Sequence, residues 1–202
     1  NPFQHVASKD VSQIALSEFD DSVDKIRAAG IEVLVFEGNN PEAPDEIFPN
    51  WLSTYSNGTI VLSSMMAKNR RIEKRNDIIG NLKSDFKVYS VLDFSVLEKN
   101  NHFLEGTGSL VLDRISKVAY ATISERTSVY ALVDLCTIMG YKPVIFETQN
   151  REGKSVYHTD LMMSIGQDFT IFCYDLLNKE DKAKVEKSSE KSTVTTKSNF
   201  VE

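Results

Sequence analysis

Only two cysteines, Cys136 and Cys173, occur among the 202 residues. Two cysteines do not make a disulfide framework, and a reducing cytosol is the usual setting for such a composition. Basic residues are outnumbered as well, since 23 Lys and Arg face 29 Asp and Glu, for a net charge of −6. This balance argues against the basic face that nucleic acids and anionic membranes require. We therefore expect a cytoplasmic protein that binds neither.

Several sequence signals are missing. No apolar stretch approaches the roughly 20 residues of a membrane-spanning helix. No basic-then-apolar leader is visible at the start, which is Asn1 rather than Met. The phosphate-binding spacings GxxxxGK[ST] and GxGxxG do not occur. His5 and His102 lack partners at the spacing of metal ligands, so neither a metal nor a cofactor is predicted.

Apolar residues make up 41% of the chain, and apolar strands alternate with helices, which predicts an α/β globule. Gly30 and Gly140 each follow a helical pattern and are expected to end it. The pair Asn57-Gly58 predicts a tight hairpin turn. Strands are expected over residues 31–36, 87–92, 102–105, 109–112, 118–123, 143–146, 156–159 and 169–174. Helices are expected over residues 12–29, 69–82, 127–139 and 178–190.

The alternation repeats. A short strand with a polar residue begins near residues 48, 103 and 157, at intervals of 55 and 54. Each is followed by an apolar strand and then a helix, and two of the helices lead into a further strand. This pattern predicts three copies of a ββαβ unit, the last one incomplete. Units arranged around a pseudo-rotation axis would bring their polar residues to one central site.

Glu105 lies between an apolar segment and the pair Gly106 and Gly108, which permit tight backbone geometry and close approach of a ligand. A carboxylate that faces a cleft there suits a bidentate contact with a planar guanidinium. The motif alone is equally consistent with a hairpin whose glutamate points to water.

His158 and Asp160 are two residues apart, so on a strand they share a face. An imidazole beside a carboxylate can transfer a proton next to a site for a cationic substrate. A structural histidine is the alternative. Arg126, at a strand-to-helix junction, could meet a carboxylate. The basic cluster at residues 69–75 is expected to be a solvated helix face, and an anion contact is the minor alternative.

Six segments together resemble the arginine deiminase/amidinotransferase superfamily, and most closely its bacterial citrulline-utilisation hydrolases. They are NPFQ (1–4), PDEIFPNWLST (44–54), NRRIEKR (69–75), FLEGTGSLVLDR (103–114), AYATISERT (119–127) and YHTDLMMSIG (157–166). The resemblance implies a pentein fold, which is a pseudo-fivefold α/β propeller of ββαβ units. About three units are expected, as a partial domain over residues 1–177. Residues 178–202 are expected to be a solvated helix and tail where the domain is cut short.

The resemblance also implies the site. The family's general acid/base histidine matches His158, and its guanidinium-binding glutamate matches Glu105. Substrate-binding positions match Asp160, Arg126 and Asn50. The sequence reads FPNW at residues 48–51 where relatives usually read FPNNW, one residue fewer beside Asn50.

In the family a cysteine near the C-terminus, in a glycine-rich segment, attacks the guanidinium or ureido carbon. No such segment occurs here, and Cys136 and Cys173 lie on an apolar helix and strand. We therefore expect part of a guanidino or ureido C–N hydrolase that needs no cofactor and is inactive as this chain. Its ligand would be a guanidino or ureido amino acid. The alternative is a non-catalytic pentein that binds a small molecule or a partner, and self-association of the isolated chain is expected in either case.

Overall fold

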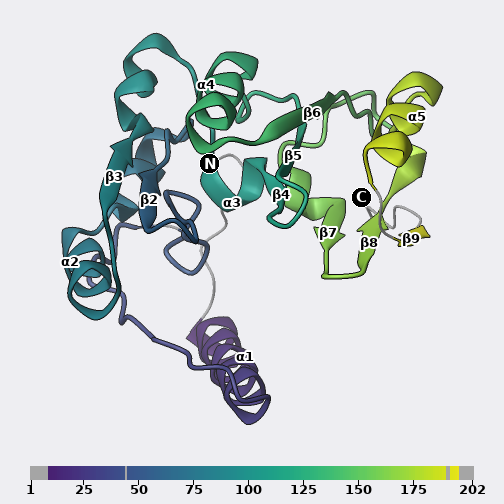
Figure 1. The fold of residues 1–202 in the computed structure, drawn as a ribbon. Helices are drawn as coiled ribbons and strands as arrows, with labels where there is room; N and C mark the ends of the chain where they lie inside the picture. The colour runs from purple at the N-terminus through teal and green to yellow at the C-terminus, as the bar shows by residue number, and fades with distance from the viewer. Residues whose placement is uncertain (1–8, 44, 190–191, 196–202) are drawn as a thin grey trace.

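The computed structural model describes residues 9–43, 45–189 and 192–195, and its strands form three small sheets (Figure 1). In each sheet the first two strands are antiparallel, and the third strand runs parallel to the second. A helix precedes each third strand. The three ββαβ copies predicted from the sequence are therefore present in the described residues.

The first two units follow the predicted order closely. The first comprises β1 (Leu52–Thr54), β2 (Thr59–Leu62), α2 (Asn76–Asp85) and β3 (Ser90–Asp93). The second comprises β4 (Val111–Asp113), β5 (Val118–Thr122), α4 (Val129–Met139) and β6 (Lys142–Phe146). The side chain of Asn57 accepts a hydrogen bond from the Thr59 amide at 3.1 Å, which closes the predicted hairpin turn. Gly140 takes a φ of +69° and ends α4, as expected.

The third unit is complete in its strands, and our expectation that it stops early is wrong. It comprises β7 (Met163–Ile165), β8 (Phe169–Phe172), α5 (Lys179–Ser188) and β9 (Ser192–Thr195). β9 pairs in parallel with β8. α5 buries Asp181 and Val185, so this helix packs against the protein and the expected boundary at residue 177 falls inside the unit. The sequence did not predict β9 because its serine and threonine residues resemble a polar tail. A strand needs only backbone hydrogen bonds to its neighbour, so polar side chains do not prevent it.

Two apolar cores lie between successive sheets, and β5 contributes to both. All five of its residues are buried. Ala119 and Ala121 belong to the core shared with the first unit, whereas Val118 and Tyr120 belong to the core shared with the third. Successive side chains of a strand point to opposite faces, so β5 joins the three units into one body. In Figure 1 the sheets follow one another along an arc.

Residues 31–36 do not form the predicted buried strand. α1 (Lys9–Ala28) ends before Gly30, whose φ is +82°, as expected. The apolar run that follows is exposed, by 60% at Ile31 and 46% at Leu34. α1 stands away from the three sheets (Figure 1). An apolar run is buried only if another strand pairs with it, and none does so among the described residues.

Other departures are local. The helix predicted over residues 69–82 is divided into η1 (Lys68–Glu73) and α2. Residues 102–105 make only isolated bridges, in which Leu104 pairs with Ser64 and Thr127.

None of the helices in the described part of the chain is long and apolar enough to cross a membrane.

Candidate functional site

Glu105 is fully buried where a short helix, α3 (Gly106–Ser109), begins. Its amide donates to Ser109 Oγ at 2.9 Å, which fixes the turn. Its carboxylate Oε1 accepts the amide of Met66 at 2.9 Å, from the first unit. The alternative of a glutamate that points to water is therefore wrong.

His158 brings the third unit to the same carboxylate. Its Nε2 lies 2.7 Å from Glu105 Oε2, and the imidazole is 6% exposed. The residue caps η3 (Thr159–Leu161), a 3₁₀ turn, rather than lying on the expected strand. Thr159 Oγ1 donates to the Ser109 carbonyl at 2.7 Å and accepts from the Thr122 amide at 3.0 Å. These two bonds hold the turn against the second unit.

The charge state of Glu105 follows from its neighbours. Burial alone would raise the pKa of this carboxyl. The hydrogen bond from His158, the charge of Arg126 and the Met66 amide together outweigh burial, so the pKa lies below its usual value. Because Glu105 is thus an anion at neutral pH, the bonded Nε2 of His158 carries the hydrogen and donates it.

Neighbouring atoms leave no room for a side chain at the two glycines beside Glu105. A Cβ on Gly108 would lie 2.6 Å from His158 Nδ1 and 2.8 Å from Asn50 Nδ2. Gly106 takes a φ of +36°, and a Cβ there would lie 2.5 Å from the Asn50 carbonyl oxygen. The glycines thus admit His158 and Asn50 from the other two units, whereas the predicted close approach of a ligand stays a prediction.

Arg126 is buried and meets a carboxylate, as the sequence suggested. Its Nη1 lies 3.3 Å from Glu105 Oε2, and its Nε is buried without a hydrogen-bond partner among the described residues. Glu105, His158 and Arg126 therefore form a triad, in which the two basic side chains share the Oε2 oxygen of Glu105.

Asn50 lies on the first-unit side of the site and is 6% exposed. Its Oδ1 accepts from Nη1 of Arg70 at 3.2 Å. Arg70 was expected on a solvated face, but it is 3% exposed and bonds the Glu73 carboxylate at 2.9 Å. The i, i+3 spacing of Arg70 and Glu73 within NRRIEKR was the signal that could have indicated a buried pair.

Asn50, Arg126 and His158 line a pocket of about 250 Å³, together with Asp160. Glu105 contacts both His158 and Arg126 but does not itself line the pocket. Partial burial raises the pKa of Asp160, and the charge of the neighbouring His158 opposes that rise. All five residues predicted for the site are thus gathered at one place. The sequence did not indicate five further lining residues, which are Asp45, Phe48, Arg70, Tyr157 and Leu161.

Neither cysteine is at the pocket. Burial raises the pKa of the Cys136 thiol to about 11. Cys173 is buried and donates to Asp175 at 2.8 Å. A thiol held protonated is a poor nucleophile, so Cys136 fits the structural role that the sequence indicated, and the burial of Cys173 fits the same role. In the described part of the chain no three His, Cys, Asp or Glu side chains gather as metal ligands.

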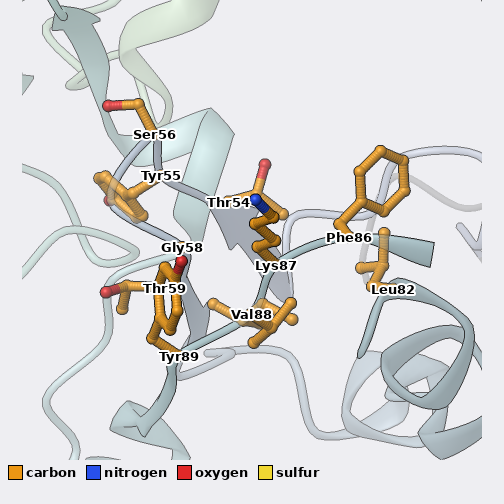
Figure 2. A pocket seen from close by; sticks show the side chains of 11 residues that line it. Thr54, Tyr55, Ser56, Gly58, Thr59, Leu82, Phe86, Lys87, Val88 and Tyr89 are labelled. Carbon is orange, nitrogen blue, oxygen red and sulfur yellow. The ribbon is translucent and has the colours of Figure 1, made fainter. Parts of the chain in front are cut away.

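A second, more apolar pocket of about 440 Å³ lies at the outer end of the first sheet (Figure 2). Tyr89 lies beside Gly58 there and is 78% exposed, and Lys87 is the charged lining residue. This pocket has no acid–base pair, so it can bind but offers no proton transfer.

Comparison with known proteins agrees with this geometry. A model of the family described as N,N dimethylarginine dimethylhydrolase, eukaryotic, matches residues 1–198. No curated protein matches the sequence. Among solved structures, the cyanobacterial arginine dihydrolase ArgZ is 16% identical with a TM-score of 0.72, over 93% of this chain and 28% of ArgZ. The amidinotransferase SxtG from Microseira wollei is 13% identical with a TM-score of 0.70, over 93% of this chain and 62% of SxtG.

A mixed α/β fold built from ββαβ units around a buried Glu–His–Arg cluster defines a pentein of the arginine deiminase/amidinotransferase superfamily. Within it, the chain belongs to the N,N-dimethylarginine dimethylhydrolase family. It spans 28% of the ArgZ chain and 65% of the separate ArgZ N-terminal domain. The closer likeness to citrulline-utilisation hydrolases stays a prediction.

Proposed function

We propose that these residues form the acid–base and head-group-binding part of a C–N hydrolase site for a guanidino or ureido amino acid, of the arginine or citrulline type. The observation that carries the proposal is the 2.7 Å contact between the buried Glu105 carboxylate and His158. A buried anion with one oxygen on a proton-transfer group suits a flat, nitrogen-rich head group.

Each residue has a stated part. Glu105 is ionised at neutral pH because its pKa is lowered, and it supplies the negative charge that holds His158 and Arg126 at the pocket wall. His158 donates and accepts the proton that a departing amine requires. Asp160, Arg126 and Asn50 bind the rest of the ligand at the pocket wall.

The covalent step of the family needs a thiolate, and this chain has none at the pocket. Cys136 and Cys173 are its only cysteines, and both are buried elsewhere. The 202 residues should therefore bind a ligand without hydrolysing it, because removing a nucleophile costs several orders of magnitude in rate. The proposal covers hydrolysis and amidino transfer alike, and a cytoplasmic location.

Calorimetry with L-arginine and L-citrulline tests the site. Binding should be saturable in the wild type and lost in Glu105→Gln. The matched control is Glu152→Gln, because Glu152 also pairs with a cation, Lys154, but is exposed and does not line the pocket. Binding that survives Glu105→Gln, or hydrolysis at ordinary enzyme rates by these 202 residues, contradicts the proposal.

A non-catalytic binder is the second candidate, favoured by the apolar pocket beside Tyr89 (Figure 2). If neither amino acid binds and a small aromatic compound instead perturbs Tyr89 and Phe86, this candidate replaces the first.

A further inference from the structure

Tyr157 is an aromatic residue at the pocket wall to which the proposed chemistry assigns no part. Its ring centroid lies 4.9 Å from Cζ of Arg126. It also lies 4.9 Å from the His158 ring, tilted by 56°. Tyr157 therefore contacts both of the side chains that touch Glu105 Oε2, and it is 39% exposed.

Hydrogen bonding restrains the guanidinium of Arg126 weakly. Its one hydrogen bond among the described residues is the 3.3 Å contact with Glu105, at the long end of the range. Its buried Nε has no hydrogen-bond partner in the part of the chain that the structure describes. Because the guanidinium has this one long hydrogen bond, the ring face of Tyr157 is its second directional contact. A cation over a tyrosine ring within about 6 Å is attracted to it.

Hydrogen bonds to the backbone hold Tyr157 and Arg126 next to each other. Ser124 Oγ donates to the Tyr157 carbonyl at 2.8 Å and accepts from the Arg126 amide at 3.1 Å. One hydroxyl thus ties residue 157 to residue 126. The contact is built by two distant segments rather than being a chance approach of two surface side chains.

We propose that Tyr157 is a positioning residue, whose ring holds the guanidinium of Arg126 against the Glu105–His158 pair. Its consequence for ligand affinity rests on the proposed function. Without the ring, Arg126 leaves Glu105 for part of the time. The carboxylate then loses one of the three groups that hold it, the other two being His158 and the Met66 amide.

The test compares Tyr157→Leu with Tyr157→Phe in the 202-residue chain. Nitrogen-15 relaxation of the Arg126 Nε–Hε group, assigned through Arg126→Lys, reports whether the guanidinium is restrained. We expect the restraint to be lost in Tyr157→Leu and kept in Tyr157→Phe. Arginine affinity should fall about fivefold in Tyr157→Leu, the size of an ordinary cation–π contact. The matched control is Tyr130→Leu, because Tyr130 stacks on His102 outside the pocket.

The outcomes separate the two claims. An unchanged Arg126 signal in Tyr157→Leu overturns the positioning role, and so does its loss in Tyr157→Phe, which would assign the effect to the hydroxyl. If the signal changes as expected but wild type binds no guanidino ligand, the positioning role stands and the proposed function fails. Amide spectra of β5 and β6 verify folding, and Tyr157→Met replaces Tyr157→Leu if that variant misfolds.

Discussion

At the residue scale, Glu105 is the residue that joins the site together. It is a buried anion that receives a hydrogen bond from His158, an amide from Met66 and the charge of Arg126. Hydrogen bonds to a buried charged group contribute about 1.5–3 kcal/mol to stability. The site therefore stabilises the fold as well as forming the pocket.

Glu105→Gln should lower the free energy of unfolding by about 2–3 kcal/mol at pH 7. Because the folded-state pKa of Glu105 lies below its usual 4.5, its ionised form stabilises the fold above that pH. That stabilisation is lost as the pH falls through the folded-state pKa. The gap between wild type and Glu105→Gln in urea unfolding should accordingly close in acid, and a gap that widens there contradicts the assigned charge.

Gly108→Ala should destabilise the protein by about 1–3 kcal/mol, because a new methyl group would overlap His158 and Asn50. Gly80→Ala is its control, since Gly80 lies in α2 with open space around its Cβ position. That change should instead stabilise by about 0.5–1 kcal/mol. Thermal unfolding measures both, and a neutral Gly108→Ala argues against the tight contact.

At the element scale, local signals predicted most of what is present. The Asn57-Gly58 turn and the caps at Gly30 and Gly140 required only neighbouring residues, and the repeat required only the spacing of similar segments. Asn50, Glu105 and His158 were placed together because each follows the repeat. The actual hydrogen bonds could not be predicted, since they join residues 53 positions apart.

The failures depended on long-range partners. Residues 31–36 carry a strand's composition but have no strand beside them among the described residues. β9 carries a tail's composition but lies beside β8. Arg70 carries a surface residue's charge but is buried, where it bonds Asn50 and the Phe48 carbonyl, 20 and 22 positions away. The composition of a segment indicates which structure it prefers, and the element beside it determines whether that structure forms.

Substitution of the exposed run tests this directly. The double variant Ile31→Lys, Leu34→Lys should change the free energy of unfolding by no more than about 0.5 kcal/mol, because both side chains face water. Ile60→Lys in β2 should prevent folding, since Ile60 is 1% exposed. Chemical unfolding of the wild type, the double variant and Ile60→Lys measures these effects. A strongly destabilised double variant would mean that residues 31–36 are buried.

At the scale of the whole molecule, the three units form an arc and leave α1 apart from them (Figure 1). Exposed apolar residues on α1 and on the run after it include Ile14, Leu16, Ile31 and Leu34. Contiguous exposed apolar surface favours association. We predict that the 202-residue chain self-associates in concentration-dependent light scattering and that Ile31→Lys, Leu34→Lys weakens this. A sharp monomer peak at every concentration contradicts the prediction.

The convergence of three units on one binding site is the central claim, and a ligand titration followed by NMR tests it most directly. Adding L-arginine should shift the ring resonances of His158 and the side-chain resonances of Arg126 and Asn50 together, with one saturation curve. Glu105→Gln should abolish all three responses. Shifts confined to Tyr89 and Phe86, or no saturable shift at His158, would contradict the account.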